Sequence, residues 1–191
     1  LSPKQITYII SSQFEFITFS QLTSILSYIS VIQLSYVTLN QISFLTPGQI
    51  SAFTLSQVSI LTPVQLNSFS SNQITALSSG QVAALSMTQI AAITITQLNL
   101  IFSSLSSKQI SYMSSIQISG LINSQMTVAL LSNLTPLQIT YITNTQIIAL
   151  SLTQLSVILS FLTTTQIPSI TITQIPLLSS SQIAALTIIQ I

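Results

Sequence analysis

The sequence predicts an all-α solenoid, a superhelix of very short capped helices. Three observations support this fold: glutamine recurs with a spacing of eight residues, Ser or Thr stands three residues before it, and apolar residues flank this unit on both sides. The repeat is roughly [L/I]-[S/T]-x-x-Q-[I/L/V]-x-x. All 22 glutamines of the 191-residue chain keep its register, so the repeat determines the fold of the whole chain.

The spacing of the glutamines is regular but not uniform. Of the 21 intervals, seventeen are eight residues, three are 12 and one is 13. Ser or Thr stands three residues before glutamine in 20 of the 22 repeats, and Ile10 and Ile122 are the exceptions. The pattern predicts structural roles in the repeat for a run of glutamines and four threonines: Gln41, Gln49, Gln57, Gln65, Gln73, Gln81, Gln89, Gln97, Thr46, Thr62, Thr94 and Thr135.

Each repeat has the features of a helix start. Ser or Thr followed three residues later by Gln is a capping box, in which each side chain bonds the backbone N–H of the other residue. The apolar residues on either side occupy the positions of a hydrophobic staple. Pro3, Pro47, Pro63 and Pro136 directly follow the cap, where the first helical residue needs no N–H donor. A short helix therefore begins in every repeat.

The longer intervals predict longer helices. After Gln21, Gln97 and Gln154 the apolar residues follow the i, i+3, i+4, i+7 spacing of one helical face. Four extra residues make about one α-turn, so they lengthen a helix without rotating its apolar face away from the core. The 13-residue interval before Gln138 begins in the same way and then slips by one residue at Leu134.

A β-solenoid is the alternative fold. Ser, Thr, Ile and Val are abundant, residues 170–176 alternate like a strand, and inward glutamines could form ladders. Proline at four equivalent positions argues against it, because each proline removes a ladder donor. Pro168 and Pro176 follow the staple residue and suit neither fold well, so any helix there must be very short.

The repeats cannot be stable alone. Burying two apolar side chains contributes about 3–6 kcal/mol, whereas ordering eight residues costs about 8–16 kcal/mol. We therefore expect residues 1–191 to form a single tandem array of about 22 octapeptides, stabilised by repeat stacking on repeat. Since the chain starts and stops within the repeat register, we expect this array to be a segment of a longer protein.

The composition excludes several classes of function. Only Lys4, Glu15 and Lys108 are charged, so the chain lacks the clustered cations of a nucleic-acid-binding protein. With almost no net charge to oppose association, we expect the chain to bind copies of itself. Polar residues interrupt every apolar run, so no transmembrane segment is expected.

The chain has few groups that could catalyse a reaction. It contains no His, Cys or Asp and a single Glu, so we expect neither an enzyme nor a cofactor, metal site or small-molecule substrate. We interpret the glutamines as capping and stacking residues in preference to a ligand-binding ladder. Six aromatic residues lie three positions after glutamine, and we expect them to fill gaps between turns, with a lateral contact as the alternative: Tyr8, Phe16, Tyr36, Phe44, Tyr112 and Tyr141.

The run LSSGQVAALSMTQIAAI, residues 77–93, resembles the LTTAQIAAL-type octapeptide arrays of very long, low-complexity bacterial proteins. The resemblance covers all 22 repeats, although this chain has more Ile, Phe and Tyr, fewer Ala, and four insertions. It implies a surface-associated or extracellular location and brings no defined activity.

These observations lead us to expect a structural protein that forms an extracellular or cell-surface filament, sheath or stalk by stacking and lateral self-association. The alternative is an adhesive module that presents a flat Ser/Thr face to a glycan or to ice. A lipid-associated array is a third possibility, suggested by the near absence of charge.

Overall fold

The computed structural model describes residues 2–184 and 186. Within this part of the chain every regular element is an α-helix or a 3₁₀-helix, so the all-α fold is confirmed and the β-solenoid is wrong. The chain divides into two compact units, Leu1–Leu105 and Ser106–Ile191, and each is described here by itself. No helix among the described residues is long and apolar enough to cross a bilayer.

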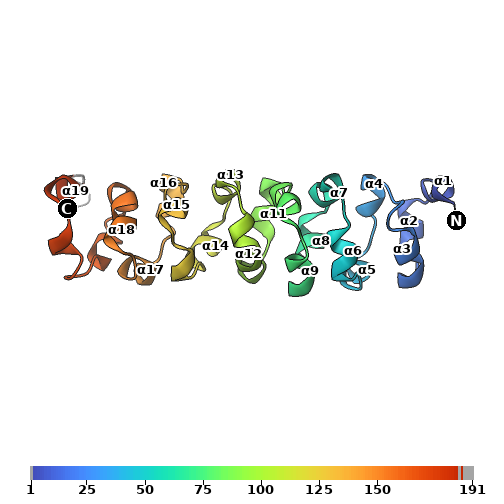
Figure 1. Ribbon diagram of the computed structural model, residues 1–191, viewed down its shortest axis with the longest axis horizontal. Coiled ribbons are helices and arrows are strands. Elements are labelled where there is room, and N and C mark those ends of the chain that lie inside the picture. The colour runs from blue at the N-terminus through green and yellow to red at the C-terminus, as the bar shows by residue number, and fades with distance from the viewer. Residues whose placement is uncertain (1, 185, 187–191) are drawn as a thin grey trace. The chain divides into compact units, whose positions relative to one another are not determined.

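The first unit is a coil of short helices that follow one another along the chain (Figure 1). Helices three positions apart in the chain lie side by side, as do α4 with α7, α8 with α11 and α9 with α12. The elements are α1 (Pro3–Ile6), α2 (Ser11–Phe14), α3 (Phe19–Ile25), α4 (Val31–Leu34), α5 (Leu39–Ser43), α6 (Pro47–Ser51), α7 (Leu55–Ile60), α8 (Pro63–Asn67), α9 (Ser71–Thr75), α10 (Ser79–Ala83), α11 (Met87–Ala92), α12 (Ile95–Ile101) and η1 (Phe102–Ser104).

The second unit is built in the same way from α-helices and several 3₁₀-helices. Here α15 lies beside α18, and α17 beside η4. Its elements are α13 (Ser107–Ile110), α14 (Ser115–Ser119), η2 (Asn123–Gln125), α15 (Val128–Leu131), α16 (Pro136–Ile139), α17 (Asn144–Ile148), α18 (Leu152–Ile158), η3 (Leu159–Phe161), η4 (Ile167–Ser169), η5 (Ile175–Leu177) and α19 (Ser180–Ala184).

The helices begin at capping boxes. In α11 the backbone N–H of Gln89 donates to Ser86 Oγ at 3.3 Å, and the N–H of Ser86 donates to Gln89 Oε1 at 2.7 Å. Where Ile10 replaces Ser or Thr, only the glutamine half persists, since the N–H of Ile10 still donates to Gln13 Oε1 at 3.0 Å. The four prolines predicted at the first helical position are all found there.

The helices end after about one turn because the next cap requires extended backbone. The caps have φ near −70° and ψ near 160°, as Thr54 shows with −70° and 161°. Among the described residues no backbone φ is positive, so none of these helices ends in a left-handed glycine cap. The chain leaves each helix through a turn and starts the next one at once.

The core contains two apolar residues from each regular repeat. One directly follows the glutamine and the other lies four positions after it, as do Ile42 and Leu45 after Gln41, which are 0% and 5% exposed. These two positions are the staple residues of successive repeats. Their burial explains why the sequence holds them apolar.

The three 12-residue intervals contain the predicted longer helices. Residues 19–25 form α3 in one interval, and α12 with η1 and α18 with η3 occupy the other two. Each extra turn buries additional apolar side chains, such as Ile25 and Leu26 in the first interval. The inserted α-turn therefore extends the core, as the spacing predicts.

The 13-residue interval differs from the expected lengthened helix. The 3₁₀-helix η2 ends at Gln125, and Thr127 then caps a separate helix, α15, by accepting the N–H of Leu130 at 3.1 Å. Leu130 occupies the glutamine position of this extra repeat, with Leu131 and Leu134 buried at the two staple positions. The apparent slip at Leu134 is thus the register of a repeat that lacks glutamine.

The segments around Pro168 and Pro176 form the three-residue 3₁₀-helices η4 and η5. A proline two residues after glutamine has no N–H to donate to the carbonyl four residues earlier, so an α-helix cannot continue through it. The expectation of a very short helix at these positions is confirmed.

Candidate functional site: the glutamine ladder

The glutamine amide connects the start of one helix to the end of another, one coil turn away. In α9, Gln73 Oε1 accepts the N–H of its own cap, Ser70, at 2.8 Å. Its Nε2 donates to the carbonyls of Ile42 and Leu45 at 2.9 and 2.7 Å. Gln73 is 2% exposed, so these bonds lie inside the protein. One side chain thereby uses its acceptor locally and both donors at long range.

This pattern recurs through each unit and forms what we call the glutamine ladder. The Nε2–carbonyl distances lie between 2.6 and 3.5 Å. In the first unit the ladder residues are Gln33, Gln41, Gln57, Gln65, Gln73, Gln81, Gln89 and Gln97, and in the second Gln138, Gln146, Gln154, Gln166 and Gln174.

The acceptors explain why the ladder is needed. The last carbonyls of any helix lack a partner within that helix, and helices of about one turn have proportionally many of them. A buried polar group left without a partner costs about 1–3 kcal/mol. Of the two carbonyls that Gln73 bonds, that of Leu45 accepts no other described N–H group, whereas that of Ile42 also accepts the N–H of Leu45 at 3.1 Å. Among side-chain N and O atoms, no described buried one lacks a hydrogen-bond partner.

Only glutamine fits both tasks at this position. Glutamate would satisfy the capping box but would direct carboxylate oxygens at carbonyl oxygens, with no donor between them. Asparagine carries the same amide on a side chain one methylene shorter. The repeat therefore depends on an amide at this reach, which explains the regular use of glutamine at buried positions.

The length of a coil turn follows from the ladder register. Gln73 donates to residues 31 and 28 positions earlier, in the fourth repeat before its own. Gln41 donates to Phe14 and Ile17, only 27 and 24 positions earlier, in the third repeat before its own. The second case includes the inserted turn of α3. Counted by this hydrogen-bond register, a coil turn contains either four regular repeats or three repeats with one insertion, and the second form is shorter by half a repeat. Helices three positions apart lie side by side within this register.

Gln49 departs from the ladder. It lies opposite the end of α3, where the carbonyl of Ile25 already accepts the N–H groups of Tyr28 and Ile29 at 2.8 and 3.2 Å. Gln49 is only half-buried and lines a cavity of about 280 Å³ together with Gln57, Thr23 of α3 and the residues that follow α3. Because α3 is longer than the helices of the regular repeats, it does not end where the Gln49 amide could bond its last carbonyls.

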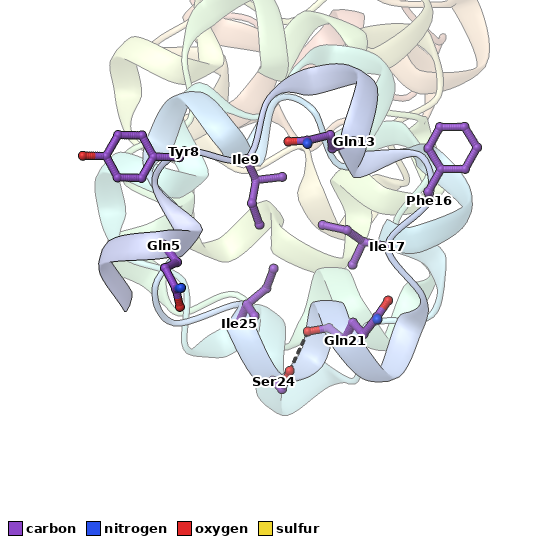
Figure 2. A pocket seen from close by; sticks show the side chains of 9 residues that line it. All are labelled: Gln5, Tyr8, Ile9, Gln13, Phe16, Ile17, Gln21, Ser24 and Ile25. Atoms are coloured by element: carbon purple, nitrogen blue, oxygen red, sulfur yellow. Dashed lines mark hydrogen bonds between the residues drawn. The ribbon is translucent and has the colours of Figure 1, made fainter. Parts of the chain in front are cut away.

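Three glutamines of the first coil turn, which are not members of the ladder, line a hollow (Figure 2). Gln5, Gln13 and Gln21 are exposed and line a cavity of about 580 Å³. Ile9 and Ile17 point toward its centre and are only half-buried, whereas Tyr8 and Phe16 point outward at its rim. This surface has the composition of the contact between neighbouring turns.

The outer surface of each unit is uncharged and partly apolar. The first two positions of the helices carry exposed apolar side chains, including Leu55, Val64 and Met87, which are 54%, 60% and 52% exposed. Lys4, Glu15 and Lys108 are exposed, and no cluster of three or more His, Cys, Asp or Glu side chains occurs among the described residues.

The aromatic residues three positions after glutamine lie outside the core, so they do not fill its interior. Tyr36 packs edge-on against Phe14 at 5.8 Å between ring centroids, and Phe44 stacks on Phe19 at 3.9 Å. These two pairs do join neighbouring turns, on the outer side. Tyr8 and Phe16 are more than 70% exposed, so the position serves different contacts in different turns.

The structure places the selected repeat residues as follows. Gln49 is half-buried, and the other seven glutamines are buried members of the ladder. The four threonines each cap a helix through their Oγ1. Sequence reasoning found the Oε1 contact through the capping-box spacing but missed the Nε2 contact, since a bond over some 24–31 residues leaves no mark in an eight-residue pattern.

Residues 56–87 match the sequence family described as the ALTTAQ repeat. The match has the length of four octapeptides, which is also the length of one coil turn of regular repeats. It supports a repeat-containing protein. No curated protein and no solved structure matches the chain at a significant level.

Proposed function

We propose that this chain is a non-catalytic structural element of an extracellular or cell-surface filament, sheath or stalk, and that it assembles by stacking and by lateral self-association. The observation that carries the proposal is the glutamine ladder: the chain's recurrent buried polar groups are used to join turn to turn. A repeat-family match over residues 56–87 agrees with such a role.

The exposed apolar side chains support lateral contact. Leu55, Val64 and Met87 stand at the first two helical positions of different helices in one unit. Only three residues of the chain are charged, so little electrostatic repulsion opposes the approach of two such surfaces. The surface location is an expectation that follows from the resemblance to bacterial octapeptide arrays.

The lateral part of the proposal is tested by removing these side chains without adding charge. We expect L55S/V64S/M87S to keep the wild-type circular dichroism and to form thinner assemblies in electron micrographs. The matched control replaces exposed serines on the same unit, S56A/S71A/S79A, and should leave the width unchanged. Equal widths for wild type and the apolar variant would contradict lateral contact through this surface.

A second function, adhesion to a glycan or to ice, is favoured by a separate observation. Exposed hydroxyl groups two residues apart lie within hydrogen-bond distance of each other at several caps: Ser86–Thr88, Thr143–Thr145, Thr163–Thr165, Thr171–Thr173 and Ser179–Ser181. An ice-binding chain would show thermal hysteresis as a monomer. Absence of both hysteresis and saturable glycan binding would remove this alternative.

A further inference from the structure

We propose that the cavity between α3 and the repeats of Gln49 and Gln57 binds an uncharged N-acetylated sugar unit, whose acetyl oxygen accepts hydrogen bonds from the glutamine amides. This site rests on the second proposed function, adhesion to a glycan, and gives that function a location and a ligand class. The structural role of the ladder does not depend on it.

The Gln49 amide has an occupied acceptor and free donors. Its Oε1 accepts the N–H and the hydroxyl of Thr46 at 2.7 and 3.1 Å. Among the described residues its Nε2 donates to no acceptor, whereas the Nε2 of Gln81, one coil turn later, donates to the carbonyl of Phe53 at 2.7 Å. The ladder amides all bond carbonyls, so a ligand carbonyl is the acceptor that fits this position.

Gln57, the next glutamine along the chain, uses only part of its donor capacity. It donates once, to the carbonyl of Ile29 at 3.4 Å. Gln89, one coil turn later, donates twice, at 2.9 and 2.8 Å. A glutamine NH₂ group carries two donors, so one N–H of Gln57 remains for a ligand oxygen. Two successive glutamines therefore bring unused donors to one cavity.

The rest of the lining fits a small neutral ligand that has both apolar and hydroxyl groups. Leu26, Ala52 and Phe53 supply apolar surface. The hydroxyls of Thr23 and Ser27 are exposed and bond no described residue, so they are free to bond ligand hydroxyls. None of the described residues that line the cavity is charged, so an ionic ligand would find no counter-charge there.

An N-acetylated hexose carries groups that match this lining. Its acetamido carbonyl accepts from the amides, its methyl group contacts the apolar side chains, and its ring hydroxyls bond Thr23 and Ser27. The volume of about 280 Å³ is near the lower limit of small-molecule sites, which suits one sugar unit. A peptide segment also offers a carbonyl, but it would leave the two hydroxyls without ligand partners.

The test is a titration of the full chain, isotope-labelled at its glutamine amides, with N-acetylglucosamine, followed by nuclear magnetic resonance. Q49E keeps the capping box and removes the donors. A52I reduces the cavity without changing a polar group, and Phe44 and Ile60 already stand at this position in the neighbouring repeats. The matched control N72E adds a carboxylate at an exposed position of α9. Circular dichroism reports the folding of each variant.

We expect saturable shifts of the Gln49 and Gln57 NH₂ signals, with a dissociation constant on the order of 1 mM, and no shift for Gln73. Q49E and A52I should each raise the dissociation constant by on the order of 10-fold, and N72E should leave it unchanged. Glucose, which lacks the acetamido carbonyl, should bind more weakly than N-acetylglucosamine by a similar factor.

Three results would contradict this assignment. Absence of a shift at Gln49 in the wild-type chain, or equal losses in the cavity variants and the control, would overturn the site. Tighter binding of N-acetyl-leucine methylamide than of the sugar would overturn the ligand class in favour of a peptide. Saturable shifts confined to other glutamines would overturn this site and leave adhesion to a glycan intact, whereas a chain that binds no glycan at all would overturn both.

Discussion

At the residue scale, one amide satisfies polar groups at both ends of the repeat's short helices. Gln89 closes its own capping box and donates to Val58 and Leu61 at 2.9 and 2.8 Å, while it is 1% exposed. The amide thus serves one helix start and one helix end. A substitution that keeps the shape and removes the donors separates these two contributions.

We predict that Gln89→Glu destabilises the fold by about 2–4 kcal/mol at pH 7, because a buried carboxylate would face two carbonyls without a donor. The same change at exposed Gln13, which makes no inter-turn bond, should alter the free energy of unfolding by less than about 0.5 kcal/mol. Denaturant unfolding measures both. Equal effects at the two positions would show that the inter-turn bonds contribute nothing.

The pH dependence of the Gln89→Glu variant has a definite sign. Burial among carbonyl oxygens raises the pKa of the introduced carboxyl in the folded state above its unfolded value. A group with a raised folded pKa favours the folded state at low pH and disfavours it once pH rises through that pKa. The variant should therefore recover stability relative to wild type on going from pH 7 to about pH 4.

The cap hydroxyls make a smaller contribution. Thr94 Oγ1 accepts the N–H of Gln97 at 3.2 Å. We predict that Thr94→Ala costs about 1 kcal/mol, whereas Thr96→Ala, next to Gln97 and exposed to solvent at one end of the same helix, should cost less. Thermal unfolding followed by circular dichroism compares the two, and a larger loss for Thr96→Ala would contradict the capping role.

At the element scale, the coil has two permitted turn lengths. A four-residue insertion lengthens one α-helix by about one turn, and the larger coil turn then closes after three repeats in place of four. The coil turn gains four residues and loses eight, so it becomes shorter by half a repeat. Deleting residues 24–27 joins Thr23 to Tyr28 and restores a regular octapeptide between Gln21 and Gln33. The first coil turn should then need four repeats to close.

We predict that deletion of residues 24–27 leaves a folded, cooperatively unfolding chain in which Gln41, in place of Gln33, donates to Ile6. Deleting only Ile25 and Leu26 rotates the following residues by about 200° and removes two buried side chains, so it should cost several kcal/mol. Thermal unfolding distinguishes the two deletions. A four-residue deletion that is as damaging as the two-residue one would contradict the two-length rule.

The sequence predicts the short helices better than it predicts the contacts between successive coil turns. Capping boxes, N1 prolines and lengthened helices follow from rules that act within eight to twelve residues, and all appear in the structure. The repeat centred on Leu130 was missed because glutamine set the register, although Thr127, Leu131 and Leu134 mark the unit. The number of repeats per turn was also not predictable, since long-range bonds from Nε2 set it.

At the scale of the whole molecule, stability comes from many similar contacts between neighbouring turns, as in other repeat proteins. The chain has no His and no Cys, the side chains that ordinarily titrate near neutrality. We predict that the wild-type unfolding free energy is constant within about 0.5 kcal/mol between about pH 6 and about pH 8. It should also change little with salt, because only three side chains are charged. Denaturant titrations at several pH values and salt concentrations provide the check.

Whether glutamine amides join the turns can be measured directly by hydrogen exchange of the side-chain NH₂ groups in glutamine-labelled protein, followed by nuclear magnetic resonance. Under conditions where the chain is monomeric, we predict slow exchange for ladder amides such as Gln73 and Gln89, and fast exchange for Gln5, Gln13, Gln21 and Gln49. Uniformly fast exchange across all glutamines would contradict the account, because it would show that none of these amides is held between turns.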